Sequence, residues 1–131
     1  MLPLKIAASG GEISRIMLAI KTIMAEADET PLLIFDEIDT GISGKIAQKV
    51  GTAMKNLSNY HQVLAITHLP QIAAISENLI LVEKEENADR TVTTSRVLNE
   101  QEKVIEIAKM ISGEVISDAS INNAKELIHQ P

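Results

Sequence analysis

Two short, wholly apolar runs that end in polar residues constrain the fold of this chain more than any other feature. Leu32–Phe35 is followed by two acids, and residues 63–66 are followed by a threonine and a histidine. A strand without polar alternation is typical of a parallel sheet buried on both faces. Residues 43–57, between the runs, carry apolar side chains at helical spacing. Strand, helix and strand in this order predict an α/β fold with a mainly parallel core sheet.

The rest of the chain predicts more helices and one hairpin. A helix over residues 9–27 is expected because apolar side chains recur there at helical spacing: Ile13, Ile16, Met17, Ile20, Ile23 and Met24. A short helix is expected from Pro70 through Ile75. Strands at 78–83 and 91–98 are expected to form an antiparallel hairpin through the polar segment 85–90. Helices over 99–112 and 117–128 complete a single domain spanning residues 1–131.

Composition and charge argue against several functions. The chain has 131 residues with 18 acidic and 12 basic side chains, a net charge of −6, whereas a surface that grips DNA is normally basic. Lys45 and Lys49, one helical turn apart, are the best candidates for a local basic patch. Phe35 and Tyr60 are too few aromatic side chains for a base-stacking platform. Cysteine is absent, and no apolar run approaches the roughly 20 residues of a membrane helix, so we expect a cytoplasmic protein.

The segment Ser9, Gly10, Gly11 and Glu12 predicts a helix start with two alternative meanings. Ser9 and Glu12 have the spacing of a capping box, in which each side chain accepts a hydrogen bond from the other residue's backbone N–H. That interpretation leaves the two glycines unexplained, since glycine in a first helical turn costs about 0.5–1 kcal/mol relative to alanine. Two positions without side chains would let an anion reach bare N–H groups at the positive end of the helix. Phosphate binding is therefore the second hypothesis.

Asp36, Glu37 and His68 are the candidate catalytic residues. An apolar strand that delivers Asp36 at its end has the Walker B arrangement, in which the aspartate holds Mg²⁺, usually through water. Glu37 could then orient and deprotonate an attacking water molecule. His68 follows the second strand and is expected at the same edge of the sheet, where α/β proteins bind ligands. The alternative is a pair of solvated acids in a turn and a structural histidine.

The phosphate cradle of a P-loop enzyme, G-x-x-x-x-G-K-[ST], does not occur in the chain. The nearest segment begins at Gly41 and continues through Gly44 and Lys45, but its glycines are too close together. Ile46 also stands where the magnesium-binding hydroxyl belongs. The chain thus has two candidate catalytic acids, a candidate phosphate-binding helix start and a candidate histidine, but it lacks the P-loop motif that would hold the nucleotide.

Taken together, these motifs resemble those of ABC-type ATPases and SMC-like heads. Three segments match these families in order and in amino-acid sequence: residues 8–12 resemble the signature motif, residues 34–44 the Walker B and D-loop segment, and residues 66–71 the H-loop. The amino-acid sequences of these segments are closest to those of the RecN family of bacterial DNA-repair proteins. Residues 104–113 and 123–127 also resemble the C-terminal segment of that family's proteins. The resemblance covers nearly the whole chain. It implies a partial P-loop NTPase fold, namely the C-terminal lobe of an ATPase head.

The resemblance also implies a role for each matched residue. Ser9, Gly10 and Gly11, in the motif that ends at Glu12, would contact the γ-phosphate of ATP bound to a second head. Asp36 would hold Mg²⁺, and Glu37 would activate the hydrolytic water. His68 would contact the γ-phosphate and help to position Glu37. Asp39 would lie in the D-loop at the interface between heads.

The implied cofactors are therefore ATP and Mg²⁺. The implied partners are a Walker A lobe and a second head in an ATP sandwich dimer. The full-length protein would be associated with the nucleoid and would bind DNA mainly through parts outside this chain. Because the Walker A segment is missing, we expect the chain to be a fragment with little or no ATP turnover of its own. One rival hypothesis is a non-catalytic dimerisation or regulatory module. A second is a metal-dependent hydrolase built on Asp36, Glu37 and His68, which is disfavoured because neighbours on an extended run point to opposite faces.

Overall fold

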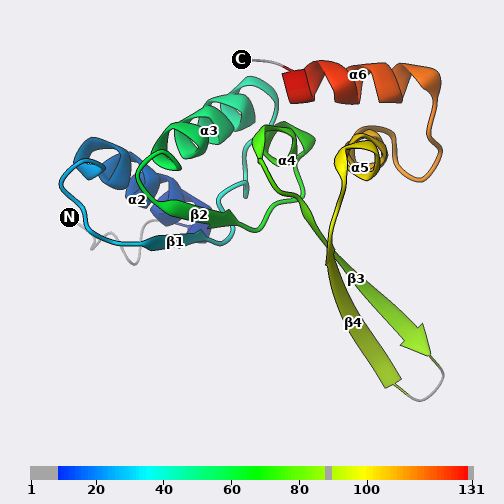
Figure 1. Cartoon of the computed structure of the whole chain (residues 1–131), viewed down its shortest axis with the longest axis horizontal. Coiled ribbons are helices and arrows are strands. Elements are labelled where there is room, and N and C mark those ends of the chain that lie inside the picture. The colour runs from blue at the N-terminus through cyan, green and yellow to red at the C-terminus, as the bar shows by residue number, and fades with distance from the viewer. Residues whose placement is uncertain (1–8, 88–89, 130–131) are drawn as a thin grey trace. The chain divides into compact units, whose positions relative to one another are not determined.

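The computed structural model describes residues 9–87 and 90–129, and Figure 1 shows the course of the chain. The chain divides into two compact units, the first ending at Ile75 and the second beginning at Ser76. The expected single domain over residues 1–131 stays a prediction. Within the described ranges, no helix combines the length and apolar content needed to cross a bilayer.

The first unit has the strand–helix–strand order that the sequence predicts. Its elements are α2 (Gly10–Met24), β1 (Leu32–Phe35), α3 (Gly44–Leu57), β2 (Gln62–Ala65) and α4 (Pro70–Ile75). The strands β1 and β2 pair in parallel, with Leu33 opposite Val63 and Phe35 opposite Ala65. The predicted parallel pairing is thus confirmed, and only α2 departs clearly from its expected bounds, because it ends at Met24 rather than at residue 27.

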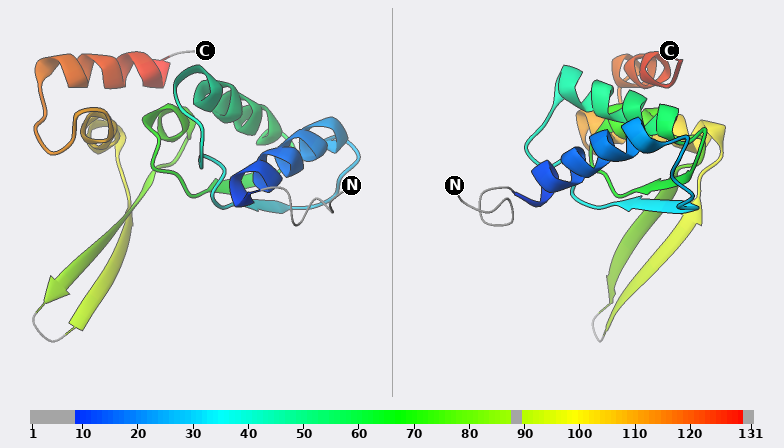
Figure 2. Two further views of the ribbon diagram at one scale, coloured as in Figure 1. Left: turned by 180° about the vertical axis from the view of Figure 1, so that it is seen from behind. Right: turned by 90° about the vertical axis from the view of Figure 1, so that its left-hand side faces the viewer.

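The core of this unit lies on one face of the strand pair, where α2 and α3 are on the same side of β1 and β2 (Figure 2). Leu33 and Phe35 are buried there with Leu18 of α2 and with Met54 and Leu57 of α3. This arrangement fixes the position of β1 from one side and leaves its carboxyl end free for the loop that follows.

The other face of the strand pair is uncovered by the described part of the first unit. Leu32, Ile34, Leu64 and Ile66 are exposed, Ile34 and Ile66 at 60%. The expectation of burial on both faces is therefore wrong for these residues, because helices of the first unit cover one face only. We call these four residues the open sheet face.

A second uncovered apolar surface runs along α2. The apolar residues whose spacing predicts this helix all remain exposed, whereas the buried residues of the helix are Gly11 and Leu18. The periodicity predicts the helix correctly but not the side of the helix that packs.

The second unit contains a hairpin and two helices. Strands β3 (Ile80–Asn87) and β4 (Arg90–Val97) pair antiparallel, and α5 (Glu100–Ser112) and α6 (Asp118–His129) follow. Asn99 and Glu102 form the predicted capping box at the start of α5. The hairpin strands are longer than expected: the polarity of residues 85–90 predicts a connection there, but β3 continues to Asn87 and β4 begins at Arg90. Val82 and Val97 of these strands are 60% and 62% exposed, so a polar segment is a poor signal of where such a hairpin strand ends. Residues 88–89, between the two strands, are outside the described residues.

Candidate active site

The predicted site residues meet where β1 and β2 end. Since the strands are parallel, both carboxyl ends lie at the same edge of the sheet. An open, shallow depression of about 270 Å³ lies at this edge, and it is lined by Asp36, Glu37, Asp39, Thr40, Ile66, Thr67 and His68. The structure thus brings together around one depression the acids after β1 and the histidine after β2.

The loop after β1 turns sharply at Glu37, which has a φ of 56°. A non-glycine residue is uncommon in this left-handed region. The Thr40 N–H donates to the Glu37 carbonyl at 3.0 Å and closes the turn, while the Ile38 side chain is fully buried. The expectation that Asp36 and Glu37 alternate along an extended run is therefore wrong, because the chain leaves the extended conformation between them.

The carboxylates of Asp36 and Glu37 are both exposed in the depression. Oδ1 of Asp36 accepts a hydrogen bond from the Glu37 N–H at 2.9 Å. Among the described residues, no three His, Cys, Asp or Glu side chains are grouped closely enough to hold a metal ion by themselves. This is compatible with Mg²⁺, which usually takes one or two carboxylates together with water and substrate phosphates.

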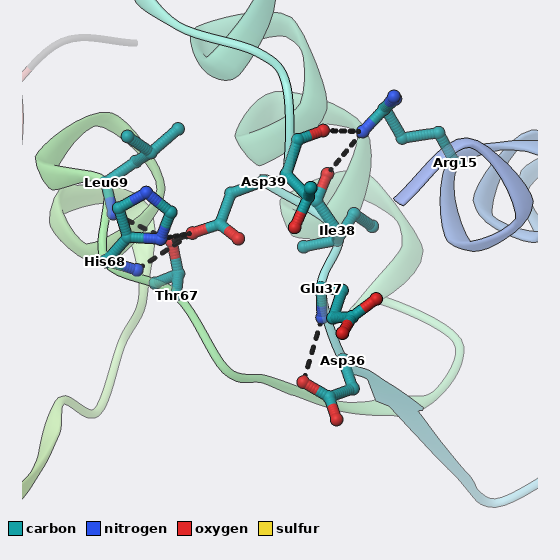
Figure 3. Close-up of polar contacts among 9 residues, drawn as sticks. Arg15, Asp36, Glu37, Ile38, Asp39, Thr67, His68 and Leu69 are labelled. Carbon is teal, nitrogen blue, oxygen red and sulfur yellow. Dashed lines mark hydrogen bonds and ion pairs between the residues drawn. The ribbon is translucent and has the colours of Figure 1, made fainter. Parts of the chain in front are cut away.

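Asp39 differs from its neighbours because its side chain is only 4% exposed. Its Oδ2 accepts hydrogen bonds from Thr67 Oγ1 at 2.6 Å and from the His68 backbone N–H at 2.8 Å, and it lies 2.9 Å from His68 Nδ1 (Figure 3). The Leu69 N–H donates in turn to Thr67 Oγ1 at 3.1 Å. These contacts tie the loop after β1 to the segment after β2.

The same contacts determine the charge of Asp39. Burial raises the pKa of this carboxyl, but the hydrogen bonds from Thr67 and from the His68 backbone, together with the His68 ring, lower it more. The pKa of Asp39 therefore lies below its ordinary value, and the group is an anion at neutral pH.

The start of α2 has the predicted capping box. The Ser9 N–H donates to Glu12 Oε2 at 2.8 Å, and the Glu12 N–H donates to Ser9 Oγ at 3.3 Å. The hydrogen bonds from the Ser9 backbone and hydroxyl hold the pKa of Glu12 below its ordinary value. The Glu12 side chain therefore caps the start of the helix.

The two glycines of this motif lie beside the loop after β1. A Cβ atom at Gly11 would lie 2.8 Å from the Glu37 carbonyl oxygen and 2.9 Å from the Thr40 carbonyl oxygen. A Cβ atom at Gly10 would lie 2.2 Å from Oε2 of Glu37. Gly11 thus has a structural reason to lack a side chain, which the sequence alone did not reveal.

Two residues of α2 for which sequence reasoning predicted no role hold the loop after β1. Ser14 Oγ donates to the Asp36 carbonyl at 2.8 Å. Arg15 Nη1 donates to the carbonyls of Ile38 at 3.1 Å and Thr40 at 2.8 Å, as Figure 3 shows. The signal that could have found them is their place one turn after the capping box, where polar residues interrupt the apolar pattern of the helix.

Comparison with known proteins gives a consistent group of relatives. No protein-family model matches the chain. The chain is 46% identical over 123 residues to the DNA repair protein RecN of Bacillus subtilis (strain 168), which is 94% of this chain and 21% of that protein. It is 49% identical over 122 residues to RecN of Rickettsia conorii, covering 93% of this chain and 22% of that one. RecN of Vibrio cholerae is 42% identical over 126 residues, covering 96% of this chain and 23% of that one.

The chain therefore spans only about a fifth of the length of the relatives it matches. A solved structure from work on ATP-driven dimerization and DNA stimulated activation of SMC ATPases has a TM-score of 0.52 and 23% identity to this chain. That match covers 80% of this chain and 62% of the other. It supports the fold of a partial P-loop NTPase lobe.

Proposed function

Because this chain belongs to the RecN family of DNA repair proteins, we propose that it supplies one half of an ATP-binding and ATP-hydrolysing head. In this proposal the chain is the C-terminal lobe of an SMC-like head and contributes the signature motif, Walker B, D-loop and H-loop. The observation that carries it is the depression at the ends of β1 and β2, which gathers Asp36, Glu37 and His68.

Asp36 is the residue that would hold Mg²⁺ in this head. Its exposed carboxylate at the end of a strand suits an ion that prefers oxygen ligands and keeps several of its waters. When bound with ATP, Mg²⁺ neutralises charge that develops on the phosphates.

Glu37 is the proposed base. Its carboxylate is exposed beside Asp36, where it can orient a water molecule and take its proton. His68 lines the same depression from the end of β2 and has a side chain that is 75% exposed, so its ring can reach a phosphate.

The start of α2 is the proposed contact with the γ-phosphate of ATP on a second head. Ser9 and Gly10 are exposed there, at the positive end of a helix. Gly11 is buried against the loop after β1, so in this proposal Ser9 and Gly10 meet the phosphate and Gly11 lets the loop approach.

The nucleotide cradle must come from elsewhere in this proposal, because the P-loop motif does not occur in the 131 residues. We propose that a Walker A lobe of the same protein packs on the open sheet face. Four exposed apolar side chains on one face of a strand pair are a surface that favours association. The completed head would form an ATP sandwich with a second head.

The biological process in this proposal is double-strand break repair and recombination in the bacterial cytoplasm, at the nucleoid. The relatives are DNA repair proteins, but a net charge of −6 disfavours strong DNA contact by this chain. DNA would be bound mainly through the rest of the protein. The rival proposal is a non-catalytic dimerisation or regulatory module with the same surface, which predicts no ATP turnover even when a Walker A lobe is present.

Glu37→Gln in the complete protein tests the proposal. The amide keeps the shape of the carboxylate but removes the base, so we expect hydrolysis to fall by about 10²–10⁴-fold while ATP binding is retained and ATP-bound head dimers accumulate. Glu29→Gln is the matched control, because Glu29 is exposed and lies before β1, away from the depression. Undiminished hydrolysis by Glu37→Gln would exclude the proposed base, and loss of ATP binding would mean that Glu37 is structural.

A further inference from the structure

A role for Asp39 at the surface between two heads does not explain why its carboxylate is buried. Its side chain is 4% exposed, and three groups of the segment after β2 converge on one of its oxygens. Two of those groups, the Thr67 hydroxyl and the His68 backbone N–H, fix the course of that segment. The third is the ring of His68.

The chemistry of these partners fixes where the ring proton lies. An ionised carboxylate can only accept hydrogen bonds, so the His68 Nδ1 that lies 2.9 Å from Asp39 Oδ2 must carry a hydrogen. This holds for the neutral ring and for the charged ring alike. The hydrogen bond made by one ring nitrogen determines the role of the other. Figure 3 shows the second nitrogen of His68 on the side of the ring turned away from Asp39.

We propose that Asp39 is a positioning residue that holds His68 as the Nδ1–H tautomer, so that Nε2 is the nitrogen presented to a ligand. Nε2 then accepts a proton or hydrogen bond when the ring is neutral and donates to an anion, such as a phosphate oxygen, when the ring is charged. The ring is 75% exposed, and without Asp39 it would sample other rotamers and both tautomers. The use of Nε2 toward phosphate rests on the proposed function, whereas the tautomer does not.

The tautomer can be measured directly on the 131-residue chain. Two-bond ¹H–¹⁵N correlation spectra at a pH of about 8, where an ordinary histidine is neutral, report which ring nitrogen carries the proton. The signal of His68 is identified by its loss in His68→Gln. We expect the Nδ1–H form in the unmodified chain and in the control Asp36→Ala, which removes an exposed carboxylate from the same depression. In Asp39→Ala we expect the Nε2–H form to gain.

In these spectra, two results would overturn the proposal: an Nε2–H ring in the unmodified chain, or an unchanged tautomer in folded Asp39→Ala. If Asp39→Ala does not fold, the unmodified chain still decides. Asp39→Asn is a second variant, because its amide oxygen can occupy the place of Oδ2. We expect that variant to keep the Nδ1–H form.

A double-mutant cycle in the complete protein tests whether Asp39 acts through His68. We expect Asp39→Ala and His68→Ala each to lower kcat by about 10–100-fold, and the double variant to be no slower than His68→Ala alone. A further loss in the double variant would mean that Asp39 acts elsewhere and would overturn the proposal. Full hydrolysis by His68→Ala, together with the expected tautomer, would instead contradict the function proposed for His68 and leave the positioning by Asp39 supported.

Discussion

Alanine at Gly11 would test how tightly α2 packs against the loop after β1. The added Cβ would meet two backbone carbonyl oxygens at 2.8 and 2.9 Å and Arg15 Nη1 at 3.0 Å, so the loop or the helix would have to shift. Overpacking of this kind costs about 1–3 kcal/mol. The gain in helix propensity from glycine to alanine, about 0.5–1 kcal/mol, offsets part of that cost.

Gly10→Ala is the matched control, since it changes the same residue type in the same helical turn. Its Cβ would meet only the carboxylate end of the exposed Glu37 side chain, which can swing away. The propensity gain nearly cancels between the two variants. We therefore expect Gly11→Ala to be less stable than Gly10→Ala by about 1–3 kcal/mol.

Urea unfolding followed by tyrosine fluorescence measures this difference. Tyr60 is the only tyrosine, the chain has no tryptophan, and Tyr60 belongs to the first unit, so the signal reports the unit that contains α2. With an m-value of about 2 kcal/mol/M, the midpoints should differ by about 0.5–1.5 M. Equal midpoints, or a more stable Gly11→Ala, would refute the packing argument.

Four further predictions follow from other parts of the structure. Arg15→Ala removes two hydrogen bonds to loop carbonyls and should speed amide hydrogen exchange in residues 38–42 but not in the last turns of α3; unchanged exchange in the loop would contradict this. The hydrogen bond from Lys21 holds the pKa of Asp28 below its ordinary value of 3.8, so its stabilising contribution is complete at neutral pH and is lost as the pH falls below about 4. Asp28→Asn should reduce the fall in the free energy of unfolding as the pH drops below about 4. An unchanged pH dependence would count against the ion pair. The isolated chain should self-associate without ATP in light scattering, and Ile34→Glu on the open sheet face should reduce this; a monomer at high concentration would refute it. Duplex DNA should bind more weakly than about 1 µM at about 150 mM salt, and tighter binding in an anisotropy titration would show that a local basic patch outweighs the net charge of −6.

Local patterns predicted the elements and the edge at which the site lies. The apolar run before Asp36 and the one before His68 predicted two parallel strands, and parallel strands bring their carboxyl ends together. Ser9 and Glu12 predicted a capping box that the structure confirms. These predictions succeed because strand alternation, helical periodicity and caps depend on residues that are close in the sequence.

Other features were decided by the tertiary structure. The left-handed turn at Glu37, the burial of Asp39 under Thr67 and His68, and the contact of Gly11 with the loop each depend on segments about 20–30 residues apart that pack against one another. The sequence shows that an acid stands at position 39 but not that its carboxylate turns inward. Tertiary packing likewise determines which apolar residues of α2 and β1 are buried. Periodicity identifies the apolar side of an element, but it does not show which other element covers that side.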